Sequence, residues 1–284
     1  MAAAPTSKNI VEQYRGEFEE KVDDLLKFSM EMNNSMQQRI QQLNENMQSM
    51  QPQMAQRGDE LVKSLQNVEP LQAAIYEKIL KTFSWIGIMQ MGIFLTAIIS
   101  SFALHPLVGL VLGSFWSAVM AYALLPALAF TQIMNAGEDE RGTRFKLLGF
   151  ALAEGLLVGY LTSQRYLSSM QPLAFITPLV IALVAQQVPG TLGESAARTT
   201  ALGVCLGCGF LLHLLIALPL GQLSAAYILL TLLYTVLGYC AIQFYVKFQT
   251  ENAPAYLDHL CMLGYVFGAL VLQGLVFLAL GGAK

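Results

Sequence analysis

The stretch from Phe145 to Ser163 constrains the fold most, because it is apolar almost throughout yet carries a carboxylate, Glu154, near its middle. At about 1.5 Å of rise per residue, a helix of this length reaches roughly 28 Å, close to the hydrocarbon thickness of a bilayer. A carboxylate at that depth costs on the order of 3 kcal/mol unless it is paired, protonated or hydrated. The stretch therefore predicts a membrane-spanning helix with Glu154 facing the interior of a bundle or a water path.

The composition supports a membrane protein. The chain is 55% hydrophobic and only 12% charged, whereas soluble domains carry about 25% charged residues. A net charge of −3 argues against nucleic-acid binding. Cys205, Cys208, Cys240 and Cys261 lie in or beside long apolar runs, which is typical neither of a disulfide framework nor of a zinc site. We expect no cofactor.

The apolar segments of residues 81–284 predict that this part of the chain forms an all-α integral membrane bundle of about seven transmembrane helices. Short loops with turn residues separate the apolar segments, and we expect the first break at His105-Pro106. Each segment is long enough to span a bilayer. The predicted spans are residues 83–104, 107–131, 145–163, 171–189, 199–220, 223–246 and 259–281.

Residues 1–80 predict a cytosolic helical extension. Met36, Ile40, Leu43 and Met47 follow heptad spacing, and Pro70 interrupts a later amphipathic stretch. Two interpretations remain open: an amphipathic helix on the bilayer surface, or a coiled coil with a partner protein or a second copy of the chain.

The distribution of lysine and arginine indicates the orientation. With the N-terminus in the cytosol, seven basic residues in short loops face inward and two face outward, as positively charged inner loops require. The inner residues are Lys78, Lys81, Arg141, Arg144, Lys146, Arg198 and Lys247, and the outer ones are Arg165 and Lys284. Because the last segment contains Gln273 and begins at Asp258-His259, it either spans the bilayer or is re-entrant.

Glu154 is the first functional candidate, as a cation ligand or a proton-titrating group; the alternative is a structural acid bonded to a neighbouring helix. His213 lies within a leucine-rich run and is either a structural residue or a pH-sensitive one. Polar groups in lipid seek one another. The polar side chains expected near Glu154 are Gln90, His213, Gln243 and Gln273.

No sequence motif indicates an enzyme. The three histidines are far apart, and neither a phosphate-binding loop nor a nucleophile elbow is present. We therefore expect a protein without catalytic activity and without a bound metal ion.

Several short motifs resemble the Bax inhibitor family. They are Asp24–Ser29 with Gln37-Gln38, Glu138–Arg141 leading into Lys146–Ala151, Glu154-Gly155-Leu156 with Gly159, Gly238-Tyr239, and His259-Leu260-Cys261. The resemblance implies a seven-helix protein of the endoplasmic reticulum membrane that regulates apoptosis and lowers luminal calcium through a pH-sensitive leak.

The gating aspartates of that family fall on Gln243 and Met262 here, so both acids are missing. Asp258 and His259, near the lost pair, are further candidates for the ion path, beside the alternative of an ordinary hydrated loop. The resemblance implies a calcium leak without the aspartate gate, with the lipid bilayer and calcium ions as partners. The alternative is a non-conducting scaffold that acts through its N-terminal helices, and a solute transporter is a weaker third option.

Overall fold

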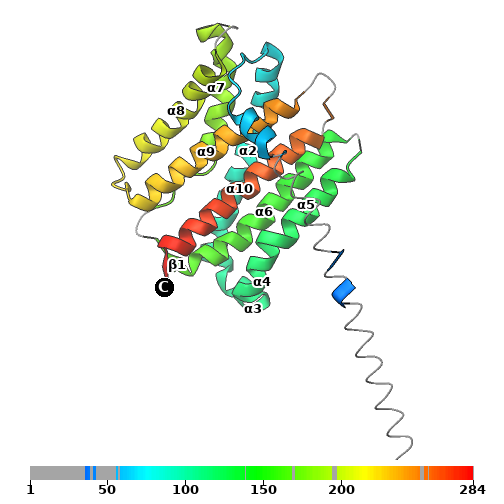
Figure 1. The fold of residues 1–284 in the computed structure, drawn as a ribbon. Helices are drawn as coiled ribbons and strands as arrows, with labels where there is room; N and C mark the ends of the chain where they lie inside the picture. The colour runs from blue at the N-terminus through cyan, green and yellow to red at the C-terminus, as the bar shows by residue number, and fades with distance from the viewer. Residues whose placement is uncertain are drawn as a thin grey trace, which may run out of the picture. The chain divides into compact units, whose positions relative to one another are not determined.

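The computed structural model is an all-α bundle, so the predicted fold class is confirmed (Figure 1). The chain divides into two units, residues 1–62 and 63–284, and the bundle belongs to the second. The structure describes residues 36–38, 41–42, 56, 58–137, 139–167, 170–193, 197–249, 253–254 and 256–283. Most of the predicted heptad stretch lies outside these residues. Residues 58–65 are helical, and the chain is non-helical at Pro70, as predicted.

Helices of seven to 27 residues make up nearly all of the described second unit. They are α2 (Ala73–Ile99), α3 (His105–Val111), α4 (Gly113–Val119), α5 (Leu125–Met134), α6 (Glu140–Ser163), α7 (Ile176–Leu192), α8 (Arg198–Ala217), α9 (Ala225–Phe248) and α10 (Tyr256–Leu280). Two π-helical turns, Ser100–Leu104 and Met120–Leu124, join α2 to α3 and α4 to α5.

Six helical stretches of the described chain are long and apolar enough to cross a membrane. They are Ala74–Val111, Gly113–Met134, Glu140–Ser163, Arg198–Ala217, Ala225–Phe248 and Tyr256–Leu280. The remaining predicted span corresponds to α7, which has 17 residues and stands at the short end of what a bilayer requires.

The first predicted break is wrong. The helical path continues through Pro106 to Val111, because this proline lies in the first turn of α3, directly after a π-helical turn. A missing N–H donor is tolerated at such a position. The chain turns instead at Gly113, whose φ of 65° lies in the left-handed region that glycine adopts without strain.

Helix α2 packs most extensively against α6 and α7. Phe83 of α2 is fully buried, and its ring meets those of Tyr245 and Tyr265 edge to face, at centroid distances of 6.4 and 6.0 Å. By contrast, Phe102 and Leu110 on the outside are 86% and 87% exposed. Large exposed apolar side chains suit a lipid-facing surface.

Glycines bring α6 close to α2. A Cβ atom at Gly159 would overlap the backbone of Ala97, and one at Gly155 would lie 2.8 Å from the Cα atom of Ile93. Small residues spaced four apart allow membrane helices to approach at backbone distance. The short spacing between α2 and α6 therefore depends on these two positions.

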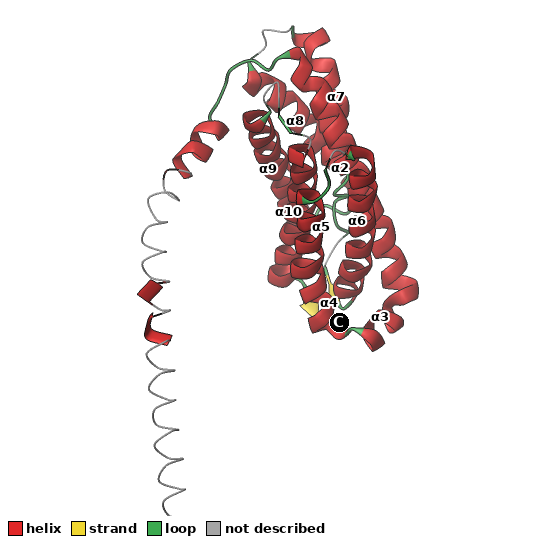
Figure 2. Cartoon of the chain, turned by 90° about the vertical axis from the view of Figure 1, so that its right-hand side faces the viewer, coloured by secondary structure: helices red, strands yellow, loops and turns green. Residues whose placement is uncertain are grey.

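A short strand pair fixes the course of the last helix. Strand β1 (Arg165–Tyr166) follows α6, and it pairs antiparallel with β2 (Gly282–Ala283), which follows α10. Figures 1 and 2 both show β1 at the same end of the bundle as α3 and α4. Helix α10 is one continuous helix of 25 residues that is long and apolar enough to cross a membrane, which favours the spanning alternative over the re-entrant one.

Candidate functional site

Glu154 is buried in the middle of α6, with 3% of its surface exposed. Its Oε2 atom has no hydrogen-bond partner among the described residues, and no hydrogen bond joins it there to the four polar residues expected nearby. The carboxyl group borders a cavity of about 10 Å³, enough for about one water molecule. The other lining residues are Met89, Leu147, Phe150, Ala151, Leu263 and Val266.

His213 is fully buried on α8. Its hydrogen bonds within the described chain are to residues other than Glu154. Its Nε2 atom lies 3.1 Å from the Thr177 hydroxyl on α7. The hydroxyl of Tyr227 on α9 donates to the backbone carbonyl of His213 at 2.9 Å. These contacts connect three helices around the histidine.

Gln243 occupies a hydrogen-bonded position on α9, where it is 1% exposed. Its Oε1 atom accepts from Nη1 of Arg198 at 3.2 Å. Its Nε2 atom donates to the carbonyls of Leu65 and Asn67 at 3.1 and 3.3 Å, and the hydroxyl of Tyr239 also donates to Leu65. One glutamine thus ties the segment before α2 to α8 and α9.

Asp258 stands in a second network at the start of α10. Its Oδ1 atom accepts from the Tyr245 hydroxyl at 3.0 Å and from Nε2 of Gln249 at 2.7 Å. Lys78 donates to Oε1 of Gln249 at 2.8 Å. Since the single hydroxyl proton of Tyr245 goes to Asp258, Thr82 is the donor in its 3.0 Å bond to Tyr245.

His259 is also buried, with 3% of its surface exposed, and its Nε2 atom has no partner among the described residues. Arg198, Gln243, Lys78, Gln249 and Asp258 lie at one end of the bundle, which we call the polar end. A cavity of about 410 Å³ opens there, bordered by Arg198, Lys247 and Gln249.

The structure therefore brings three of the five predicted site residues to the polar end: Gln243, Asp258 and His259. It places Glu154 deeper along α6 and His213 in a separate cluster. The sequence interpretation missed the site roles of Arg198, Lys78, Tyr245 and Gln249. A signal existed for Arg198, because a basic residue at the start of a long apolar run needs a polar partner.

Within the described part of the chain, no group of three histidine, cysteine, aspartate or glutamate residues could hold a metal ion. The polar end is instead built from amide, hydroxyl and guanidinium groups that bond to one another and to backbone carbonyls.

The long apolar helices and the hydrogen-bonded polar end define a helical membrane protein. A comparison of the chain with protein families finds a match: the model of the family described as Interactor of ZYG-11 matches residues 4–283. The chain belongs to that family. No curated protein and no solved structure matches it.

This family match overturns the Bax inhibitor prediction. It covers almost the whole chain and is to a different family, so the calcium leak and the role in apoptosis that the resemblance implied are wrong. The short motifs misled because small residues recur in many membrane helices for packing reasons. Gln243, placed at a gating position by the resemblance, is instead engaged by Arg198 and two carbonyls.

Proposed function

We propose that this chain binds a ZYG-11-type protein while anchored in a membrane. The observation that carries the proposal is the family match across residues 4–283, because the family is described by its interaction with ZYG-11. The proposed role is binding, without catalytic activity.

We place the binding surface at the polar end. A partner outside the bilayer meets the ends of the bundle, and basic side chains concentrate at this one. Lys81 and Arg141 are both exposed there. Since basic loops favour the cytosolic side, we propose that the polar end faces the cytosol. The endoplasmic reticulum location rested on the overturned resemblance and is not part of the proposal. A contribution from the N-terminal helices, or self-association through them, stays a prediction.

The test is co-purification of the full chain, in detergent, with a ZYG-11-type protein from the same organism. We expect the wild-type chain to retain the partner. The double charge reversal Lys81→Glu with Arg141→Glu should weaken retention, because it changes the charge of the proposed surface by four units.

Leu220→Glu is the matched control, since Leu220 is 55% exposed and lies in the α8–α9 connection at the other end. Retention of this variant at the wild-type level, together with loss for the double reversal, would support the polar end. A folded wild-type chain that retains no partner would refute the proposed function. Equal retention of the partner by all variants would refute the polar end as the binding surface but would leave the proposed binding function standing.

A further inference from the structure

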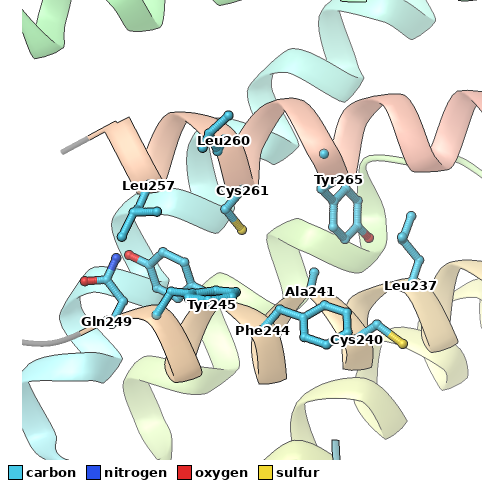
Figure 3. A pocket seen from close by; sticks show the side chains of 12 residues that line it. Leu237, Cys240, Ala241, Phe244, Tyr245, Gln249, Leu257, Leu260, Cys261 and Tyr265 are labelled. Carbon is cyan, nitrogen blue, oxygen red and sulfur yellow. The ribbon is translucent and has the colours of Figure 1, made fainter. Parts of the chain in front are cut away.

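Two hollows of opposite character meet at Gln249. One is the polar cavity of about 410 Å³ at the polar end. The other is an apolar groove of about 490 Å³ between α9 and α10, shown in Figure 3. Gln249 borders both, and its amide group is held by Lys78 and Asp258. A ligand that fills both hollows must therefore have a polar head and an apolar tail.

The polar cavity suits an anionic head. Its charged lining residues are Arg198, Lys247 and Glu69, so cations outnumber acids by two to one. Arg198 is only 6% exposed, yet its Nε atom has no hydrogen-bond partner among the described residues. A guanidinium group with a free donor is well suited to phosphate, which it binds through paired N–H groups.

The backbone adds to this preference. Arg198 is the first residue of α8, whose N-cap, Ala197, makes no side-chain hydrogen bond, and no acidic residue stands in the first turn. The amide of Arg198 itself donates to the carbonyl of Val68 at 3.4 Å, so the helix start attracts an anion mainly through its dipole. The buried arginine and the helix dipole thus favour the same charge.

The groove suits a hydrocarbon tail. Along α9 it extends from Phe248 to Leu237, a rise of roughly 17 Å, which is about half the hydrocarbon thickness of a bilayer. Its far wall on α10 includes Leu260 and Gly264, and a Cβ atom at Gly264 would meet nothing within 4 Å.

The depth of the polar cavity in the membrane also fits a lipid with a polar head and an apolar tail. Arg198 begins one membrane-spanning helix, and Lys247 is the penultimate residue of the next, so the polar cavity lies where lipid headgroups lie. Basic pockets between membrane helices at this level recognise anionic headgroups. We propose that one anionic glycerophospholipid binds here, with its phosphate in the polar cavity and an acyl chain in the α9–α10 groove. The lipid proposal does not rest on the proposed function, although both sites lie at the polar end.

The test is native mass spectrometry of the purified full chain in detergent, with phosphatidylglycerol or phosphatidylcholine added at matched concentrations. We expect phosphatidylglycerol to be retained preferentially. Lys247→Gln should lower its affinity about fivefold, since a basic residue near a headgroup contributes on the order of a fivefold factor. Gly264→Leu should weaken both lipids because its side chain fills the groove.

Matched controls come from α6. Lys146→Gln removes an exposed basic residue of another helix, and Gly149→Leu adds a side chain at an exposed glycine that also has open space. Both variants should bind like the wild type. Arg198→Gln should bind more weakly than Lys247→Gln; if it does not fold, Lys247→Gln and Gly264→Leu decide.

Two results would overturn the proposal. Equal retention of the two lipids, unchanged by Lys247→Gln, would refute the preference of the site for an anionic headgroup. Wild-type lipid binding by Gly264→Leu, with inorganic phosphate displacing the lipid completely, would show that the cavity takes free phosphate rather than a lipid.

Discussion

Arg198 and Gln243 stand 45 positions apart in sequence, and a 3.2 Å hydrogen bond joins them at the polar end. The same glutamine donates to the carbonyls of Leu65 and Asn67. The pair therefore connects α8, α9 and the segment before α2. Because Arg198 is buried, its guanidinium group depends on this partner.

Gln243→Ala should destabilise the bundle by about 2–3 kcal/mol, since it removes the hydrogen-bond partner of a buried guanidinium group and of the Asn67 carbonyl. The Leu65 carbonyl keeps the Tyr239 hydroxyl as a donor. Thermal unfolding in detergent measures the change. Gln187→Ala, at an exposed glutamine of α7, is the control and should leave the melting temperature unchanged. Equal melting temperatures for both variants would contradict a structural role for the pair.

Gly159→Ala should destabilise the bundle by about 1–3 kcal/mol, because the new methyl group overlaps the Ala97 backbone and forces α2 and α6 apart. Gly149→Ala on the same helix meets open space and should be neutral or stabilising by up to about 1 kcal/mol. Both substitutions change helix propensity, but only Gly159→Ala disturbs the contact between α2 and α6. The difference between the two melting temperatures therefore measures the effect of that contact. Stabilisation by Gly159→Ala would show that the two helices are not in backbone contact.

Glu154→Met should keep the bundle folded and raise its stability by about 1–3 kcal/mol. The substitution replaces a buried carboxyl oxygen that has no partner with an apolar side chain of similar size. Chemical or thermal unfolding in detergent provides the measurement, with Glu154→Gln as the variant that keeps the shape and polarity. A marked loss of stability for Glu154→Met alone would reveal a required partner for the carboxyl group.

The order of the helices predicts which connections lie on the same side of the membrane. In a chain whose own four cysteines are replaced, Asn135→Cys and Leu220→Cys should react with a membrane-impermeant thiol reagent from opposite sides. Helices α6, α7 and α8 lie between the two positions, which makes an odd number of crossings. Labelling of both cysteines from the same side of sealed vesicles would contradict the topology.

Much of the fold follows from the sequence, because long apolar runs leave a chain few alternatives in a bilayer. The break near Pro106 could not be located this way, since proline is tolerated in the first turn of a helix. The turn at Gly113 depends on a backbone angle that glycine permits but does not require.

The site was harder to predict. Gln243 and Asp258 were recognised as polar residues in or beside apolar runs, but their partners Arg198 and Gln249 come from other helices, and spacing in the sequence does not reveal such pairs. The family resemblance failed for a related reason: its motifs are short and consist largely of residues that pack helices, so they occur without common descent.

The pairing of Arg165 with Ala283 has a consequence for synthesis of the chain. A ribosome that has made β1 must still make α7, α8, α9 and α10 before the partner strand exists. These four helices therefore enter the membrane as a loop whose closure comes last, and such distant contacts slow folding. Until then the two residues of β1 lack their strand partner, so this end of the bundle is completed only after the whole chain has been made.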